Sequence, residues 1–340
     1  MAFSIMNDGP ELLRITREEL EPIMTRALQE RRERFGNEIL FYSPTSYPYR
    51  VNEHAVLNPY RFVSLSVTGN ACSLRCEHCM GRYLGGMQPA TTPKELVRRA
   101  QIAKENGGTG LLISGGSDSQ GRVPLKRFGE AIRSIKSELE MQVVVHTGLL
   151  DEATADILQK AQIDAAMLDV IGDDRTARDV YHLTNGTERT KQSLRYLQER
   201  NIPFVPHVLV GLNRGEIVGE LSALDMIAKR KPAAVVIIVL SPLPHTPMSD
   251  VKPPSPETVG RVITVARLGL ETTPLLLGCA RPMGTHKIET DRMAILGGVN
   301  GIAYVSQEGV KLAEELGLRP KFIDECCSLA HLHLVASSEL

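Results

Sequence analysis

The sequence predicts an α/β protein that folds as a (β/α)8 TIM-type barrel. From residue 61 onward, short apolar segments alternate with longer segments of helical periodicity. Several apolar segments are uninterrupted, as at 143–145 and 233–239, which is typical of parallel strands covered on both faces. Eight strand–helix units fit into about 250 residues, the usual size of such a barrel. No linker divides the chain.

A helical extension over 1–60 precedes the predicted barrel. Thr16 and Glu19 stand at the spacing of a capping box, and apolar residues then recur at helical spacing over 16–35. We expect this helix and a short strand after it to pack on the bottom or the outer wall of the barrel. Residues 1–8 lack the basic region and the long apolar core of an export signal, so we expect none.

The barrel is predicted over 61–317, and a C-terminal tail over 318–340 follows it. The strands are expected at 62–67, 110–114, 142–146, 164–169, 204–210, 234–240, 273–277 and 300–305. The helices are expected at 93–106, 125–139, 151–161, 187–200, 215–230, 256–268, 287–296 and 307–316. The last helix should run down the barrel and end near Gly317, so that the tail can fold back over the barrel mouth.

The composition excludes several classes of protein. A formal net charge of −1 leaves no basic footprint for nucleic acid, so we expect no nucleic-acid partner. No apolar run reaches the roughly 18–20 residues of a membrane helix, so we expect no membrane partner. Six cysteines in a chain of 340 residues without an export signal favour free thiols in the cytoplasm over a disulfide framework.

Cys72, Cys76 and Cys79 form a C-x3-C-x2-C motif directly after the first predicted barrel strand. Three thiolates packed into eight residues can bind three irons of a 4Fe–4S cluster. The fourth iron then stays open and can chelate an amine and a carboxylate, as S-adenosylmethionine offers. A structural zinc site normally takes four ligands, often as paired knuckles, and only His78 is at hand to complete one.

This motif resembles the signature of the radical S-adenosylmethionine superfamily. The family holds the methionine amino group with a glycine-rich segment after the second strand, which Ser114, Gly115, Gly116 and Ser117 match here, although the family often has glutamate in place of Ser117. His78 stands where the family usually has an aromatic residue behind the adenine. The resemblance implies a reducing electron donor and cleavage of S-adenosylmethionine into methionine and a 5′-deoxyadenosyl radical.

Three further strand ends carry candidate contacts to the cofactor. His146 ends the third strand and could contact the cofactor or simply pack in the interior. Asp169 ends the fourth strand, where biotin-synthase-like members carry an acidic residue, and could accept hydrogen bonds from the ribose or cap a turn. Gly211 follows the fifth strand and resembles the hydrophobic-glycine element that packs the adenine, or it could merely relieve crowding.

The other three cysteines suggest a second cluster. Cys279 ends the seventh strand, and Cys326 and Cys327 lie in the tail. Residues 318–326 can span about 30 Å when extended, whereas a strand is only about 17–20 Å long. The tail can therefore bring Cys326 and Cys327 near Cys279, where we expect a second 4Fe–4S cluster. Alternatively, Cys279 is a small buried apolar residue and the tail cysteines are incidental.

A fourth ligand for this second site is not evident from the sequence. The candidates are Ser337, Ser338, His331, His333 and a group from outside the chain. Arg281 lies close after the seventh strand and could contact a cluster or a substrate carboxyl group, or form an ordinary salt bridge.

Residues 38–320 resemble the biotin-synthase-like branch, and most of all the split, two-protein lipoyl synthase of archaea and some bacteria. The segments that carry the resemblance are 67–79, 113–116, 145–149, 169–172, 180–183 and 278–282. Biotin synthase itself fits poorly, because its second cluster takes cysteines from strand ends that here carry Ser114 and His146.

The resemblance implies insertion of sulfur at C6 or C8 of an octanoyl chain on a lysine of a carrier protein or peptide. The second cluster, with Cys279, Cys326 and Cys327 as ligands, would be consumed as the sulfur source. A second lipoyl synthase component would be a partner. Two alternatives stay open: a biotin-synthase-like mutase or carbon–carbon bond-forming synthase with one cluster, and an iron–sulfur electron carrier. The glycine-rich segment and the large barrel argue against the carrier.

Overall fold

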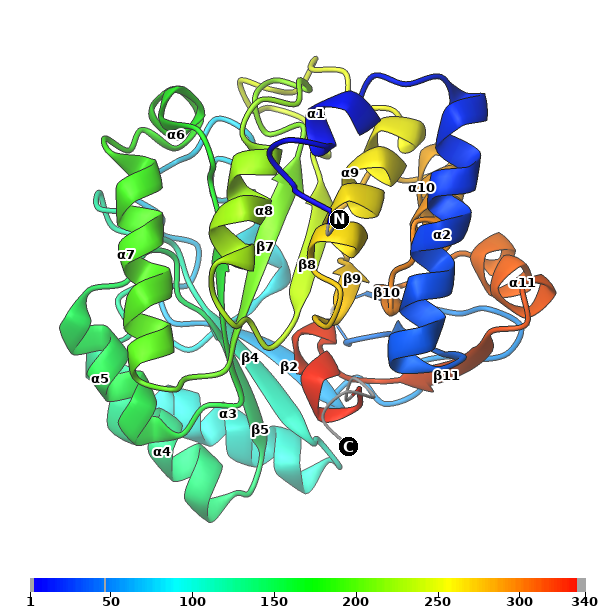
Figure 1. Cartoon of the computed structure of the whole chain (residues 1–340). Coiled ribbons are helices and arrows are strands. Elements are labelled where there is room, and N and C mark those ends of the chain that lie inside the picture. The colour runs from blue at the N-terminus through cyan, green and yellow to red at the C-terminus, as the bar shows by residue number, and fades with distance from the viewer. Residues whose placement is uncertain (1–2, 46, 335–340) are drawn as a thin grey trace.

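The computed structural model describes residues 3–45 and 47–334 and contains one curved sheet with helices on its outer face (Figure 1). The strands are β1 (Glu38–Tyr42), β2 (Phe62–Ser66), β3 (Gln88–Pro89), β4 (Gly110–Ser114), β5 (Gln142–His146), β6 (Ala165–Asp169), β7 (Phe204–Val210), β8 (Val235–Val239), β9 (Leu275–Leu277), β10 (Gly301–Ala303) and β11 (Arg319–Ile323). All pairings between these strands are parallel. This confirms the predicted α/β barrel class.

The helices alternate with the strands as the sequence predicts. They are α1 (Gly9–Leu12), α2 (Arg17–Phe35), α3 (Pro93–Glu105), α4 (Gly129–Glu138), α5 (Glu152–Ala161), α6 (Asp174–Tyr181), α7 (Gly186–Glu199), α8 (Glu220–Ala228), α9 (Pro256–Gly269), α10 (Thr285–Leu296) and α11 (Gln307–Glu315), with the short 3-10 helices η1 (Arg82–Gly86), η2 (Lys126–Phe128) and η3 (Cys327–Leu332). Side-chain caps begin α3, α5, α6, α9 and α11, because Thr92, Asp151, Asp173, Ser255 and Ser306 each accept a backbone N–H of the first turn. The prediction missed α6.

The barrel is incomplete, since its first and last predicted strands do not pair. β10 pairs with β1 instead of β2, and β11 pairs with the other edge of β1. Among the described strands, β3 and β11 are therefore the two edges of the sheet. Two strands thus come from segments that the sequence assigns to the N-terminal extension and the tail. The buried apolar strand β1 continues the sheet beside β10, and β11 pairs with the other edge of β1.

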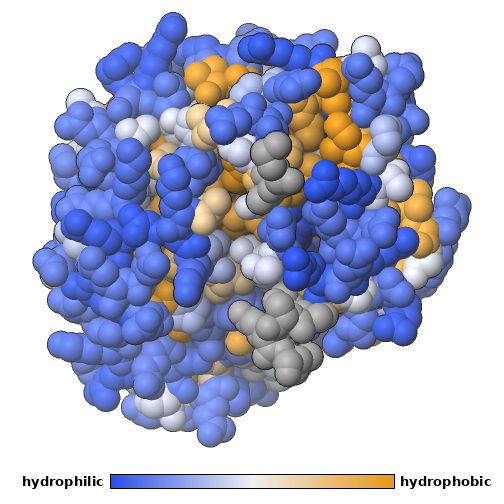
Figure 2. Space-filling model, viewed as in Figure 1, coloured by the Kyte–Doolittle hydropathy of each residue, from blue (hydrophilic) through white to orange (hydrophobic). Residues whose placement is uncertain are grey.

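The N-terminal helix α2 packs on the outer wall of the barrel. Its predicted capping box is formed, with the Glu19 N–H donating to Thr16 Oγ1 at 3.3 Å and the Thr16 N–H donating to Glu19 Oε2 at 2.8 Å. Leu20 and Met24 are buried, and the helix contacts α9 and α10. Figure 2 shows this side of the molecule as mostly hydrophilic, with hydrophobic residues emerging in limited groups. Within the described residues, no helix has the length and apolar character to cross a membrane.

The C-terminal tail enters the interior of the barrel. It returns from α11 along β11, as predicted, but η3 then packs against β6 and β10. Ser328 donates a hydrogen bond to the sulfur of Met167 at 2.7 Å, and Leu329 and Ala330 have no exposed surface. The expectation that the tail covers the mouth is therefore wrong for residues 327–334, because these apolar side chains gain more burial inside the barrel.

Candidate active site

A cavity of about 370 Å³ opens at the carboxyl ends of the strands, the edge where barrels of this kind place their functional residues. Most of the predicted site residues line this cavity. They are Cys72, Cys76, His78, Cys79, Ser114, Gly115, Gly116, Ser117, His146, Asp169 and Cys279. The fold therefore brings together predicted site residues that follow or end β2, β4, β5, β6 and β9.

The cysteine motif lies in a tightly coiled loop after β2. Arg75, Met80 and Gly81 adopt left-handed backbone angles, with φ of 45°, 49° and 78°. The N–H groups of Cys79 and Met80 both donate to the carbonyl of Cys76, at 3.1 and 2.8 Å. This coil brings the three thiols of the motif to the same cavity.

Two of these thiols interact directly. The hydrogen bond between Cys76 and Cys79 raises the pKa of Cys76, which burial raises further. The same hydrogen bond lowers the pKa of Cys79. This interaction favours the thiolate at Cys79, and thiolates are the form that binds iron.

The glycine-rich segment lies directly against the cysteine loop. A Cβ atom at Gly116 would stand 2.0 Å from the carbonyl oxygen of Ala71 and 2.6 Å from Cys72 Cα. The Gly116 N–H donates to Thr68 Oγ1 at 2.7 Å, and the Ser73 N–H donates to the Ser117 carbonyl at 2.8 Å. Only glycine allows the backbone to approach this closely.

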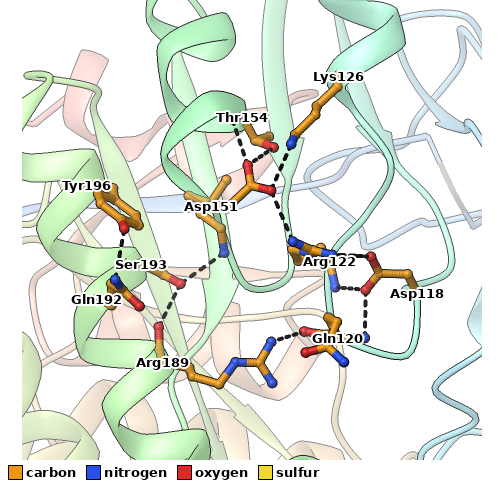
Figure 3. Close-up of polar contacts among 11 residues, drawn as sticks. Asp118, Gln120, Arg122, Lys126, Asp151, Thr154, Arg189, Gln192, Ser193 and Tyr196 are labelled. Carbon is orange, nitrogen blue, oxygen red and sulfur yellow. Dashed lines mark hydrogen bonds and ion pairs between the residues drawn. The ribbon is translucent and has the colours of Figure 1, made fainter.

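Polar contacts fix the rest of this loop to two helices (Figure 3). Arg122 pairs with Asp118 at 3.1 Å and with Asp151, the cap of α5, also at 3.1 Å. Arg189 on α7 donates to the carbonyl of Gln120. The loop that carries the glycine segment is thus braced from its outer side by α5 and α7.

Asp169 forms a polar cluster with two histidines and a tyrosine. His146 Nε2 lies 3.6 Å from Asp169 Oδ1, and Tyr181 Oη donates to Asp169 Oδ2 at 3.1 Å. One potential ligand atom each of His146, Asp169 and His207 lie within 4.8 Å of one another. Enclosure in the cavity opposes the charge of Asp169, but the interaction with His146 and the nearby histidines outweighs it and holds the carboxyl pKa well below its usual range. Asp169 is therefore an ionised acceptor facing the cavity.

His78 and Gly211 differ in their relation to the cavity. The buried His78 ring packs 5.2 Å from the Tyr181 ring, and its Nδ1 has no hydrogen-bond partner among the described residues. Gly211 (φ +81°) is not among the lining residues, and a Cβ there would stand 2.6 Å from Pro254. Close packing accounts for this glycine, and its contact with adenine stays a prediction.

The second set of cysteines meets in the barrel interior. Cys279 is exposed to the cavity, where the surrounding protein desolvates its thiol and raises its pKa, with a further contribution from Cys326. A hydrogen bond with Cys327 lowers the pKa of Cys326 to about 7, to which the charge of His146 also contributes. Cys327 is buried in the apolar interior of the barrel, and Cys326 packs against the same cluster of side chains. Cys279, Cys326 and Cys327 nevertheless form no group with ligand atoms within 4.8 Å among the described residues.

The predicted partners of this second set have other contacts. Arg281 is buried and forms a salt bridge to Asp291 at 2.9 Å, so the ordinary salt bridge is the alternative that the structure supports. His333 pairs with Glu325 at 3.1 Å. His331 interacts with backbone groups of Ser328 and Asp164. Ser337 and Ser338 lie outside the described residues.

Sequence reasoning missed the aromatic and apolar rim of the cavity. Tyr47 and Tyr83 are 55% and 44% exposed at its edge, and Leu84, Met87 and Tyr304 also line it. These residues come from loops after β1, β2 and β10 and have no regular spacing. Two tyrosines in predicted loops, Tyr47 and Tyr83, are a signal in the sequence that could have pointed to this rim.

Comparison with known proteins agrees with this site. The sequence matches the Radical SAM superfamily over residues 66–221. Biotin synthase of Buchnera aphidicola is 25% identical over 254 residues, which cover 71% of this chain and 70% of that one. Biotin synthase of Marinobacter nauticus is 24% identical over 325 residues, which cover 88% and 89% of the two chains.

Two solved structures share the fold. Methylornithine synthase (PylB) superposes with a TM-score of 0.65 at 16% identity, covering 94% of this chain and 95% of that one. HydG, the FeFe-hydrogenase maturase of Carboxydothermus hydrogenoformans, gives a TM-score of 0.67 at 19% identity, covering 94% and 76%. The family match and the biotin synthase relatives support the radical SAM superfamily for this chain and, within it, the biotin-synthase-like branch.

The radical SAM family implies a 4Fe–4S cluster and S-adenosylmethionine, and the residues present fit both groups. Cys72, Cys76 and Cys79 offer three thiols to one cavity, one of them already favouring the thiolate. The backbone at Gly116 passes the cysteine loop without a side chain in the way. A 370 Å³ cavity beside these residues leaves room for a small molecule.

Proposed function

We propose that this chain inserts sulfur into the octanoyl chain of an octanoyl-lysine carrier protein or peptide, as a component of a lipoyl synthase. The observation that carries the proposal is the path of the tail. It follows β11 to the carboxyl end of β1 and then enters the barrel interior with Cys326 and Cys327, while Cys279 and the cysteine motif line the cavity at the mouth of the same barrel. A sulfur-inserting enzyme needs a sulfur source next to the carbon that loses hydrogen, and a second cluster on these thiols would be that source.

The cavity suits a flexible apolar chain that is attached at one end. Leu112, Leu209 and Ile238 line its walls, while Tyr47 and Tyr83 stand at its rim. An octanoyl chain could enter between the two tyrosines and bury its methylene groups, each of which contributes about 0.8 kcal/mol when fully buried. The lysine and the carrier would then remain outside.

The residues of the chain have separate tasks in this reaction. Cys72, Cys76 and Cys79 would hold a 4Fe–4S cluster, which with S-adenosylmethionine supplies a radical that removes hydrogen from the substrate carbon. Gly116 and the neighbouring backbone would position the methionine moiety, and Asp169 would accept hydrogen bonds from the ribose. The apolar walls would exclude water from the reacting carbon.

The proposed partners follow from the same reaction. An octanoylated carrier or peptide is the substrate, a second lipoyl synthase component would complete the other insertion, and a reducing donor supplies the electron. The six cysteines are free thiols, which supports a reducing setting such as the cytoplasm.

An anaerobic assay with an octanoyl-lysine peptide tests the proposal. We expect the wild type, given reductant and S-adenosylmethionine, to add at least one sulfur to the peptide, as detected by mass spectrometry. The Cys326→Ala variant should still cleave S-adenosylmethionine but release unmodified peptide. Cleavage that the peptide does not stimulate, with no sulfur added by the wild type, would contradict the proposal.

A radical enzyme of another reaction type with one cluster is the second candidate. It is favoured by the burial of Cys327 among apolar side chains of the barrel interior, where this cysteine has a packing role that needs no cluster. In this case the triple variant of these cysteines would keep full activity on the true substrate. A mutase or a carbon–carbon bond-forming synthase fits this description.

A further inference from the structure

We infer that Tyr181 is a positioning residue, which holds the Asp169 carboxylate and the cysteine loop in one arrangement around the cofactor. The inference rests on one part of the proposed function, the contact of Asp169 with the ribose of S-adenosylmethionine. It concerns the last residue of α6, the helix that the sequence analysis missed.

The hydroxyl of Tyr181 binds one oxygen of the carboxylate. Tyr181 Oη donates to Asp169 Oδ2 at 3.1 Å, while His146 Nε2 lies 3.6 Å from the other oxygen, Oδ1. Tyr181 is only 7% exposed, and all three residues line the cavity. An ionised carboxylate offers about four acceptor positions. The Asp169 carboxylate is therefore held at both oxygens and keeps acceptor positions for a ligand in the cavity.

The ring of Tyr181 packs against the cysteine loop. Its centroid lies 5.2 Å from that of His78, which stands between Cys76 and Cys79 in the motif. His78 is itself buried, so this contact is shielded from solvent. One side chain thus contacts both the loop that would hold the cluster and the acidic residue at the end of β6.

The backbone on either side of Tyr181 fixes this position without help from the hydroxyl. The Glu77 N–H donates to the Val180 carbonyl at 2.9 Å, and Glu77 Oε1 lies 3.2 Å from His182 Nε2. His182 adopts a left-handed conformation, with φ of 58°, and ends α6. Loss of the hydroxyl alone should therefore leave the cysteine loop in place and free only the carboxylate of Asp169.

Simple packing is the alternative account of Tyr181. Its ring belongs to an apolar cluster with Leu183 and Leu212, and a buried tyrosine usually finds a partner for its hydroxyl wherever it packs. Tyr49 is the matched control, because its hydroxyl donates to the Val305 carbonyl at 2.9 Å and it is not among the residues that line the cavity. Packing predicts that loss of either hydroxyl affects stability alone, whereas positioning predicts weaker cofactor binding for Tyr181.

Isothermal titration of the anaerobic, iron-loaded protein with S-adenosylmethionine tests the inference. We expect Tyr181→Phe to raise the Kd about tenfold, because a hydrogen bond to a charged group is lost, and to keep the wild-type iron content. Tyr49→Phe should keep the wild-type Kd. Tyr181→Leu, which also loses the ring contact with His78, should bind less iron as well.

A double variant separates positioning from packing. Asp169→Ala alone should raise the Kd, and Tyr181→Phe added to it should raise the Kd no further, because the two side chains act as one unit. A wild-type Kd in Tyr181→Phe, or effects of the two changes that simply add, would overturn the inference and leave the cofactor contact of Asp169 standing.

The same titrations distinguish this failure from a failure of the proposed function. A wild-type Kd in Asp169→Ala would overturn the ribose contact and the inference with it. The titrations contain no octanoyl-lysine peptide, so sulfur insertion is decided separately by the peptide assay.

Discussion

Single residues set the geometry of the cavity, and Gly116 is the clearest case. Replacing it with alanine would force the new Cβ into the Ala71 carbonyl and the Cys72 backbone, at 2.0 and 2.6 Å. The cysteine loop must then shift, which costs about 1–3 kcal/mol for overpacking of this kind. We expect Gly116→Ala to fold but to bind S-adenosylmethionine roughly 10–100-fold more weakly.

Isothermal titration of the loaded protein measures this loss. Gly85→Ala is the matched control, since no atom lies within 4 Å of the position where its Cβ would be. The control should keep wild-type affinity. Equal affinities in the two variants would mean that the glycine segment does not approach the cofactor.

Arg281 is a second single residue that supports the site, although its side chain does not line the cavity. Its guanidinium and the Asp291 carboxylate are 1% and 0% exposed, and it also donates to the carbonyls of Gly278 and Tyr304. Removing one partner of a buried pair typically costs about 3–5 kcal/mol because the other charge stays buried. We expect Arg281→Met to lower the free energy of unfolding in urea by that amount, whereas Arg292→Met, at a half-exposed pair with Glu289, should change it by less than about 1 kcal/mol.

At the scale of elements, Asp151 connects the start of α5 to the loop after β4. It caps the helix through Thr154 and pairs with Arg122 and Lys126. Partial burial opposes its charge, but hydrogen bonds from Thr154 and Lys126 lower its pKa to about 2. Because the folded pKa lies below the ordinary value of about 3.9, this stabilisation is complete above pH 4 and is lost as the pH falls toward 2.

Replacing this residue therefore has a pH-dependent effect. We expect Asp151→Ala to lower the free energy of unfolding by about 1–2 kcal/mol at pH 7. Most of this loss comes from the helix cap, because exposed ion pairs contribute little. The difference from the wild type should narrow below pH 4 in urea titrations. Asp151→Asn, which keeps a capping oxygen, should lose less; a loss independent of pH would refute the role of the charge.

The element η3 fills the barrel interior with its apolar side chains. Leu329 has no exposed surface, whereas Leu332 in the same short helix is 50% exposed. Truncating a buried leucine to alanine costs about 2–5 kcal/mol, and an exposed one much less. We expect Leu329→Ala to lower the unfolding free energy accordingly and Leu332→Ala to be nearly neutral; similar effects would mean that the tail does not pack inside the barrel.

For the molecule as a whole, the eight repeating units could be predicted because parallel strands and their helices have local patterns. Each predicted strand overlaps an observed one, and the residues after those strands meet in one cavity. The incomplete barrel could not be predicted, because the choice of β1 over β2 as the partner of β10 depends on packing between distant segments. Helix α6 was missed because it is only eight residues long and three of them, Ala177, Val180 and Tyr181, are apolar, which is too short a pattern to stand out in the sequence.

Only part of the site could be predicted from the sequence, because the rest depends on packing between distant segments. The cysteine motif and the glycine segment are local sequences whose chemistry is fixed by their spacing. The cluster of His146 with Asp169 and His207, and the rim tyrosines Tyr47 and Tyr83, come from separate strands and loops. Only the folded chain brings these side chains together.

Mössbauer spectroscopy with iron and sulfide analysis can show whether one barrel holds two clusters. The measurement compares the anaerobic wild type with the Cys72/Cys76/Cys79→Ala variant. We expect the variant to keep a complete 4Fe–4S spectrum with half the iron of the wild type, held by Cys279, Cys326 and Cys327. A folded variant without iron would contradict it and leave a radical enzyme with a single cluster.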